Sequence, residues 1–482
     1  MSKTITTRFA PSPTGFMHIG NLRTALYSYL LSKSQGGNFI LRIEDTDQER
    51  FVEGAVDVIL KTLEMTGITY DEGPVAGGEH GPYIQSERLP IYKEYAEKLI
   101  AGGHAYYCFC TPERLESLKD DKGIGGYDGH CRDLSAEVIK KNLAEGVPYV
   151  IRQKMPLEGT TSYVDEVYGE VTIDNSELRD QIMIKADGYP TYNFCHVVDD
   201  YLMGVTHVVR GNEYLTSTPK YCLLYDAFGW ERPTYVHLPL LMGKDEDGKV
   251  SKLSKRHGAV SFQDLIADGY LPEAIVNYIA LLGWCPKDTN QEFFTMDELK
   301  ENFSMEGLSK SPAVFDYEKL NWFNSEYIKK MDDESYNAKA MPVLDELCPE
   351  YINTKKLAEL LKSRIYAFCE ITERIGFVLE RLDMDTELYT NKKNKTTPEG
   401  CKEILTDCLP LLRAAESWDN DTLFELLKDY AASTEKKSGA VMWAIRIAIA
   451  RLGVTPGGAT ELMEVFGKDE TISRIEQAIS EL

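Results

Sequence analysis

The chain lacks a long apolar segment and an excess of positive charge. Its 482 residues contain no apolar run of about 18 residues, the length that a membrane helix needs. The opening Met1-Ser-Lys-Thr4 has no apolar signal-peptide core. We therefore expect a soluble cytoplasmic protein without a membrane partner. The net charge of −24 counts against a general nucleic-acid binder, although a local basic face is compatible with that balance.

Disulfide-like cysteine spacing, internal repeats and low-complexity tracts are also lacking. Most of the ten cysteines are therefore expected to be reduced, buried thiols. One group differs, because Cys108, Cys110 and Cys131 lie near one another with His130 and Asp133 beside the last. Three thiolates with either Asp133 or His130 as the fourth ligand can hold a structural zinc ion. A zinc site and ordinary buried cysteines are both left open.

Strand and helix patterns alternate at the start of the chain. They predict strands over Thr4–Phe9 and Asn38–Glu44, and helices over Leu22–Leu31 and Phe51–Met65. This alternation predicts the α/β class, with a Rossmann-type doubly wound parallel sheet. In such a sheet, ligands bind beyond the C-terminal ends of the strands.

The alternation resumes later in the chain. Strands are predicted over Thr191–Val198, His207–Val209 and Tyr235–Pro239, with a helix over Thr218–Phe228. Between the two parts, short alternating runs predict an α+β insertion. Towards the end of the chain the apolar residues follow helical spacing, which predicts an all-α C-terminal region.

These patterns divide the chain into five segments. Two are the halves of a nucleotide-binding catalytic domain, one is the insertion, one carries a lysine-rich loop, and one is helical. The two halves of the catalytic domain are residues 1–90 and 189–245, and the insertion between them is residues 91–188. The segment with the lysine-rich loop is residues 246–325, and the helical segment is residues 326–482.

The loop after the first predicted strand favours anion binding. It reads Arg8-Phe-Ala-Pro-Ser-Pro-Thr-Gly-Phe-Met-His-Ile-Gly-Asn21. A strand ends there, a rigid turn follows, and a helix N-terminus presents free N–H groups to the turn. His18 and Gly20 are therefore expected beside a nucleotide phosphate. A second cluster, Lys252-Leu-Ser-Lys-Arg256, is expected to be a mobile loop that supplies cations. A solvated basic patch is the alternative for that cluster.

Together the two segments resemble the paired signature motifs of class I aminoacyl-tRNA synthetases. The stretches Arg8–Thr24, Tyr189–Gly211 and Lys252–Val260 are similar to bacterial-type glutamyl-tRNA synthetases. The resemblance implies ATP-dependent ligation of L-glutamate to tRNA-Glu through a glutamyl adenylate, with release of AMP and pyrophosphate. It also implies Mg²⁺ on the phosphates and, for this chain, we expect a monomer.

The resemblance further implies roles for the segments. The insertion would bind the tRNA acceptor end, and residues 246–325 would carry the lysine motif and contact the tRNA stem. Residues 326–482 would read the anticodon. This last segment has 29 acidic and 21 basic side chains, a net charge of −8, so its tRNA face must be a local patch. The basic residues considered for that patch are Lys355, Lys356, Lys362, Arg364, Lys392, Lys393 and Lys395.

The resemblance also implies site residues. The catalytic residues would be His18, Lys252 and Lys255. The ATP-binding residues would be those three with Gly20, Asn21 and Ser254. The glutamate-binding residues would be Arg8, Ala10, Ser12, Glu44, Tyr192, His196 and Arg210.

Two features of this pocket favour glutamate over glutamine. Arg210 stands where glutaminyl enzymes have a non-basic residue, and those enzymes read Pro-Glu-Pro-Asn-Gly where this chain has Pro11-Ser-Pro-Thr-Gly15. Separately, Glu44 matches the position that binds the α-amino group. Two arginines suit a dicarboxylate, because a guanidinium pairs bidentately with a carboxylate. For zinc, some bacterial relatives carry Cys-x-Cys with Cys-x-His, and here Asp133 replaces the histidine.

Three other functions fit the sequence less well. A short paralogue that glutamylates a modified tRNA base has no anticodon domain, whereas this chain has a long helical end. Small nucleotidyltransferases are shorter and lack the Arg8, Glu44 and Arg210 set. A non-enzymatic tRNA-binding relative should have lost His18 or the Lys255 loop, and this chain has both. Whether tRNA-Gln is also charged does not follow from the sequence.

Overall fold

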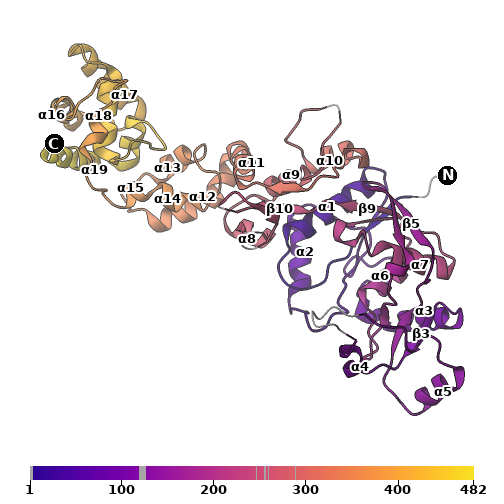
Figure 1. Cartoon of the computed structure of the whole chain (residues 1–482). Helices are drawn as coiled ribbons and strands as arrows, with labels where there is room; N and C mark the ends of the chain where they lie inside the picture. The colour runs from indigo at the N-terminus through magenta and orange to yellow at the C-terminus, as the bar shows by residue number, and fades with distance from the viewer. Residues whose placement is uncertain (1–3, 119–125, 246, 255–256, 259, 288) are drawn as a thin grey trace. The chain divides into compact units, whose positions relative to one another are not determined.

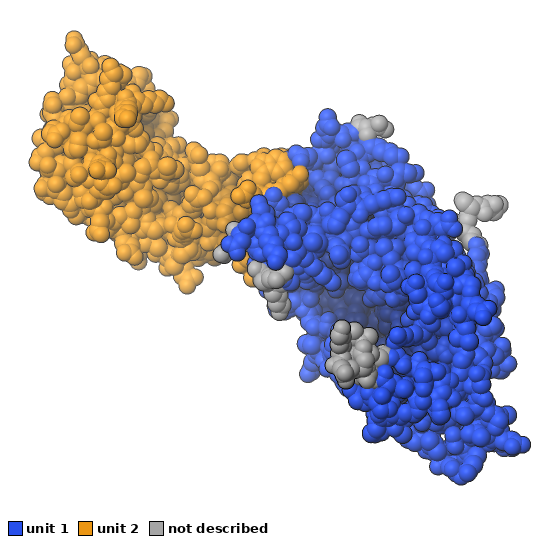
Figure 2. All heavy atoms as spheres, viewed as in Figure 1, with its two compact units in different colours: residues 1–265, 275–316 blue, residues 266–274, 317–482 orange. Residues whose placement is uncertain are grey.

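The computed structural model of the chain forms two compact units (Figure 2). Unit 1 comprises residues 1–265 and 275–316, and unit 2 comprises residues 266–274 and 317–482. Every helix in the described part of the chain is too short or too polar to span a bilayer. The residues that the structure describes are 4–118, 126–245, 247–254, 257–258, 260–287 and 289–482.

Unit 1 begins with the predicted β–α–β arrangement (Figure 1). β1 (Thr6–Phe9) pairs in parallel with β2 (Asn38–Leu41), and α1 (Ile19–Lys33) connects the two strands. α1 begins almost one turn before its predicted start. β2 ends earlier than predicted, so Glu44 lies in the loop beyond the strand. The C-terminal ends of both strands and the N-terminus of α1 therefore meet at one edge.

A four-stranded sheet follows in the order β6-β5-β9-β8. β8 (His207–Gly211) and β9 (Thr234–Leu238) are parallel and match the predicted strands. β5 (Thr160–Asp165) and β6 (Gly169–Asp174) form a hairpin, and β5 continues the sheet beside β9. This hairpin belongs to the predicted insertion in sequence, yet it pairs with a strand of the second catalytic half. The parallel pairs confirm the predicted α/β class.

The strand predicted over Thr191–Val198 is wrong. That segment is the helix α6 (Tyr192–Leu202). Its β-branched and aromatic residues favour a strand locally, but Phe194 and Val197 are three positions apart and both fully buried. Packing of this helical face overrides the local preference. Asp200, predicted to follow a strand, therefore projects from a helix.

The part of the chain between the catalytic halves contains an antiparallel sheet. β3 (Ala105–Cys108), β4 (Val150–Gln153) and β7 (Ile182–Ile184) form it. α3 (Leu89–Ala101) packs on this sheet through a buried apolar cluster, and α5 (Ala136–Ala144) lies on the outside with no buried residue. The mixture of strands and helices agrees with the predicted α+β character.

A fourth sheet positions the lysine motif. β10 (Leu241–Lys244) pairs with β11 (Val250–Lys252) on one side and with β12 (Ala313–Phe315) on the other. The first lysine of the motif is therefore the last residue of a strand. Other helices of unit 1 include α2 (Ala55–Met65) and α7 (Thr218–Phe228).

Unit 2 is helical, as predicted. α18 (Ser438–Ala450) is apolar on almost all sides and buried along most of its length, which is typical of a central helix. Neighbouring helices cover it (Figure 1). The principal helices of the unit are α11 (Tyr317–Lys330), α12 (Asp333–Leu347), α13 (Thr354–Leu361), α16 (Pro398–Ala414), α17 (Asn420–Ser433) and α19 (Ala459–Glu481).

Candidate functional site

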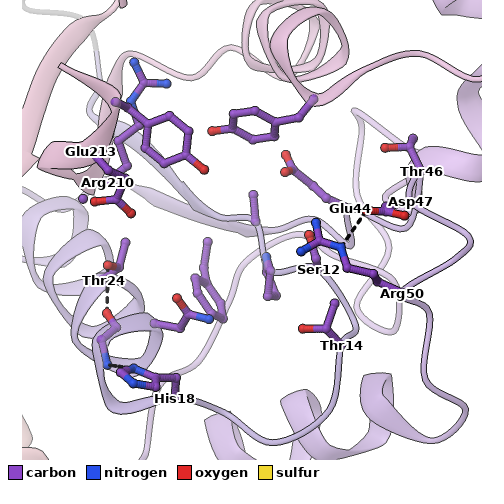
Figure 3. A pocket seen from close by; sticks show the side chains of 18 of the residues that line it. Ser12, Thr14, His18, Thr24, Glu44, Thr46, Asp47, Arg50, Arg210 and Glu213 are labelled. Carbon is purple, nitrogen blue, oxygen red and sulfur yellow. Dashed lines mark hydrogen bonds and ion pairs between the residues drawn. The ribbon is translucent and has the colours of Figure 1, made fainter. Parts of the chain in front are cut away.

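A cavity of about 1050 Å³ opens at the C-terminal ends of the parallel strands in unit 1 (Figure 3). The structure brings ten of the predicted site residues to its wall, although they span more than 240 positions of the chain. These are Arg8, Ala10, Ser12, His18, Gly20, Asn21, Glu44, Tyr192, Arg210 and Lys252.

Three other predicted residues lie elsewhere or are not described. His196 is 2% exposed and lies behind the wall, where its Nε2 is 3.5 Å from Nη1 of Arg210. Burial lowers the pKa of His196 to about 3, so it is neutral. Ser254 is held outside the wall by its backbone N–H, which donates to Nδ1 of His257 at 3.0 Å. Lys255 lies outside the described residues.

His18 lies at the end of the cavity where the sequence predicts phosphate binding, which we call the phosphate end. It caps α1, because its Nδ1 accepts a hydrogen bond from the backbone N–H of Gly20 at 3.0 Å. The hydrogen must then be on Nε2, which leaves His18 a donor on its other side. Burial and the nearby charge of Lys252 lower the pKa of His18, so the ring stays neutral. A Cβ at Gly20 would lie 3.2 Å from Nδ1, so a larger residue would crowd the cap.

The end of the cavity where the sequence predicts amino-acid binding, which we call the amino-acid end, is a buried network of charges. Arg8 Nε donates to Asp200 Oδ1 at 2.9 Å, and Arg42 donates to the same oxygen at 2.8 Å and to Glu44 Oε1 at 2.9 Å. Burial alone would raise the pKa of Asp200, but Arg8 and Arg42 lower it well below its usual range. Burial raises the pKa of Glu44, and Arg42 opposes that shift. Arg42 thus fixes two of the acidic groups at this end.

Arg210 lies at the same end without an acidic partner. It is 5% exposed, and its Nη2 donates to Thr218 Oγ1 at 2.7 Å. The rings of Tyr214 and Tyr221 lie over its guanidinium at 5.0 and 4.9 Å. Within the described part of the chain, no carboxylate is at ion-pair distance from Arg210. A buried cation of this kind needs a counter-ion, and a substrate carboxylate can supply one.

Several lining residues were not predicted from the sequence. Thr24 donates to the carbonyl of Gly20 at 3.0 Å, and Asp47 forms an ion pair with Arg50 at 2.7 Å. Figure 3 shows these side chains around the same cavity as His18 and Glu44. Some of them could have been found from their position in the sequence, because Asp47 closely follows Glu44, and Glu213 and Tyr214 closely follow Arg210. The additional residues include Thr14, Thr24, Thr46, Asp47, Arg50, Lys185, Asp187, Glu213 and Tyr214.

The three predicted cysteines form a cluster. The thiols of Cys108, Cys110 and Cys131 all lie within 4.8 Å of one another. Burial raises the pKa of Cys110 to about 12, whereas for Cys108 hydrogen bonds outweigh burial and lower it. Asp133 is instead exposed and paired with Lys154 at 3.2 Å, and it is not part of the cluster. His130 is exposed and also outside it. The donor set thus fits three of the four positions of a zinc site.

A second cavity, of about 430 Å³, lies in unit 2. Arg364 and Arg446 both line it, together with Thr455 and the Pro-Gly-Gly turn before α19. Of the basic residues considered for tRNA binding, Lys356 pairs with Glu359 at 3.1 Å and Lys362 pairs with Asp333 at 2.7 Å. Arg364 is one of the candidates named from the sequence, whereas Arg446, in a strongly apolar helix, is not among them.

Comparison with known proteins identifies the class. Residues 4–322 match the catalytic domain of class I tRNA synthetases (E and Q), and residues 317–479 match an anticodon binding domain. The chain therefore belongs to the class I tRNA synthetases. The anticodon domain also argues against the short paralogue, which has none.

Close relatives narrow the family to the glutamate–tRNA ligases. The chain is 54% identical to ligases of that name from Clostridium novyi and Clostridium botulinum, over 100% of this chain and 99% of each relative. Two solved structures are similar over their whole length. A glutamate tRNA ligase from Elizabethkingia meningosepticum in complex with its amino acid is 35% identical with a TM-score of 0.87, covering 99% of both chains. The glutamate-tRNA synthetase from Elizabethkingia anophelis is 35% identical with a TM-score of 0.88, covering 99% of this chain and 100% of that one. The resemblance seen in the motifs is confirmed.

Proposed function

We propose that the chain joins L-glutamate to tRNA-Glu through a glutamyl adenylate. The observation that carries this proposal is Arg210, a buried cation that faces the cavity and has no carboxylate partner among the described side chains. Glu44 lies in the same cavity and can accept the α-ammonium group of an amino acid. A dicarboxylic amino acid therefore satisfies both charges, whereas glutamine would leave Arg210 without a counter-ion.

The first step needs no protein nucleophile. An oxygen of the glutamate α-carboxylate attacks the α-phosphate of ATP, the new O–P bond forms, and the bond to pyrophosphate breaks. Catalysis is then positioning plus stabilisation of developing charge. His18 donates from Nε2, and Lys252 and Lys255 supply cations to the phosphates. Mg²⁺ neutralises phosphate charge in such reactions and is held largely by the phosphates themselves.

In the second step the terminal ribose hydroxyl of the tRNA attacks the activated carbonyl carbon, and AMP leaves. Because ATP and tRNA are its substrates, we propose that the enzyme acts in the cytoplasm, and that it acts as a monomer. Size-exclusion chromatography with light scattering should then give a mass near 54.5 kDa.

Aminoacylation of purified tRNAs tests the function. We expect glutamate, and not glutamine, to be joined to tRNA-Glu, and the same assay with tRNA-Gln defines the tRNA range. Glutamate-dependent exchange between ATP and pyrophosphate should be near background without tRNA and appear with tRNA-Glu. The rationale is a pocket that is aligned only when the acceptor end binds. Charging with glutamine alone would contradict the proposal.

The second cavity is the surface that we propose for anticodon bases. Two arginines and a glycine turn suit planar, hydrogen-bonding rings, because guanidinium groups stack on bases and donate to their edges. This assignment is supported by the match of unit 2 to an anticodon binding domain. It leaves most of the acidic helical surface outside the tRNA contact.

A structural zinc ion at the three cysteines is proposed on their geometry. Three thiolates are soft ligands of the kind that zinc prefers. Metal analysis of protein purified without chelators should find about one zinc per chain, and Cys108→Ser should abolish it. Cys401→Ser, a buried cysteine in unit 2, is the matched control and should keep the metal. Absence of zinc in the unaltered protein would favour reduced, buried thiols.

A further inference from the structure

A row of buried polar side chains extends from Arg210 away from the cavity. Arg210 Nε donates to His237 Nε2 at 3.1 Å, and His237 Nδ1 lies 2.6 Å from Asp165 Oδ2. His237 is fully buried and Asp165 is 1% exposed. Neither side chain lines the cavity in the part of the chain that the structure describes. Asp165 is the last residue of β5, and His237 lies on the neighbouring strand β9.

The proton positions along this row follow from the partners of Asp165. Its Oδ1 accepts the backbone N–H groups of Val167 and Tyr168, and its Oδ2 accepts the backbone N–H of His237. A carboxylate that only accepts requires the hydrogen of the ring on Nδ1. The lone pair of Nε2 then points at Arg210. Burial lowers the pKa of His237 despite the opposing effect of Asp165, so the ring is neutral.

These contacts fix the plane of the Arg210 guanidinium. Nε is held by His237, Nη2 is held by Thr218, and Tyr214 and Tyr221 lie over the group. Thr218 itself donates to the carbonyl of Tyr214 at 2.7 Å, so its oxygen is oriented to accept. Nη1 lies 3.5 Å from Nε2 of His196 behind the cavity wall, and the N–H groups of Arg210 that remain can reach the cavity. A planar fork with a fixed edge matches a carboxylate in one orientation only.

We infer that Asp165 and His237 form a positioning relay that holds Arg210 for the side-chain carboxylate of the amino acid. The inference rests on the proposed function and deepens it. Asp165 and His237 are positioning residues, because neither touches the cavity. The relay makes the choice of glutamate over glutamine depend on the tautomer of a histidine behind the pocket wall. It also ties that choice to β5, a strand from the segment between the two catalytic halves.

An isosteric change tests the relay. In Asp165→Asn the amide nitrogen would donate towards Nδ1 of His237, which favours the tautomer with hydrogen on Nε2. The Nε2–H of His237 would then face the Nε–H of Arg210, so two donors would meet and the hydrogen bond would be lost. We expect kcat/KM for glutamate to fall about tenfold, mostly through KM, while KM for ATP stays within about twofold. Discrimination against glutamine should fall with it.

Two substitutions of His237 separate positioning from packing. The amide oxygen of His237→Gln can reach the place of Nε2 and accept from Arg210. The shorter amide of His237→Asn can reach Asp165 but not Arg210. We expect His237→Asn to raise KM for glutamate about as much as Asp165→Asn, and His237→Gln to restore much of the loss. Thr161→Val is the matched control. Thr161 lies on the same strand as Asp165, and the change removes a buried 2.6 Å hydrogen bond to Asn175.

The outcomes distinguish the relay from the function itself. Thr161→Val should keep the KM for glutamate, and the thermal unfolding midpoint of every variant shows that it is folded. A folded Asp165→Asn or His237→Asn enzyme with unchanged KM and unchanged glutamine discrimination would overturn the relay while leaving the proposed function intact. Equal losses in His237→Gln and His237→Asn would also overturn it. An unaltered chain that charges no tRNA with glutamate would overturn both.

Discussion

The two ends of the catalytic cavity hold their charged groups in different ways. At the amino-acid end, Arg8, Glu44 and Arg210 are nearly fully buried and each bonds to another side chain. At the phosphate end, Lys252 is exposed at the end of a strand and His18 is fixed through a backbone N–H. Buried charges are costly unless they are paired or hydrogen-bonded. The charged groups at the amino-acid end are therefore held by neighbouring side chains, whereas the cations for the phosphates come from a more exposed part of the chain.

The largest effect is expected at the phosphate end. If Lys255 stabilises charge in the transition state, Lys255→Ala should lower kcat for adenylate formation by about 10²–10³, the scale of losing one such donor. The rate of glutamate-dependent ATP–pyrophosphate exchange in the presence of tRNA measures this. Lys249→Ala, nearby in the exposed turn before β11, is the matched control and should change little. A rise in KM for ATP with kcat unchanged would mean that Lys255 binds the ground state only.

At the amino-acid end the loss should appear in a different constant. Arg210→Ala removes a charge-assisted contact of about 1.5–3 kcal/mol, so kcat/KM for glutamate should fall roughly tenfold or more. KM for ATP should change much less, because the two ends are separately held. Steady-state kinetics with each substrate varied in turn show the split. Equal changes in both KM values would break the distinction between the two ends.

The same contrast explains what the sequence could predict. At the phosphate end each group lies within one short motif, because His18 and Gly20 lie within one turn of α1 and Lys252 lies in the lysine motif. The bracing of the amino-acid end is not local, because Arg42 reaches Asp200 across 158 positions and His237 reaches Asp165 across 72. Spacing along one sequence contains no signal for such pairs.

The prediction of one secondary-structure element, α6, was also wrong because contacts between distant parts of the chain decide its conformation. α6 was predicted as a strand because its local composition favours β structure, and only burial against neighbouring elements makes it a helix. Parallel strands, the helical C-terminal region and the class of the fold were predicted because their periodicities are long. The three thiols of the cysteine cluster were predicted correctly. Asp133 and His130 lie away from the cluster, because adjacency in the sequence does not fix the direction of a side chain.

Unit 2 extends the comparison to a second arginine. Arg446 is half-buried and its Nη2 donates to the carbonyl of Gly453 at 2.9 Å, so it is less constrained than Arg210. If it contacts an anticodon base, Arg446→Ala should raise KM for tRNA about fivefold, the scale of a hydrogen bond worth about 1 kcal/mol. KM for glutamate and for ATP should be unchanged. Arg413→Ala, an exposed arginine of the same unit outside the cavity, is the control. Equal effects of both variants would indicate general electrostatic attraction.

The smallest effect expected is a pH dependence that separates the two ends. Burial raises the pKa of Glu44, so its carboxylate becomes protonated at a higher pH than an ordinary glutamate. The ionised form is the one that can bind an α-ammonium group, and KM for glutamate should therefore rise a few-fold as the pH falls from 7.5 towards about 5.5. The pKa of His18 is shifted the other way, by burial and by Lys252, so the neutral donor persists to a lower pH than an ordinary histidine would allow. KM for ATP should change less than KM for glutamate. A KM for glutamate that stays flat over this range would show that Glu44 remains ionised and that its partner Arg42 outweighs burial.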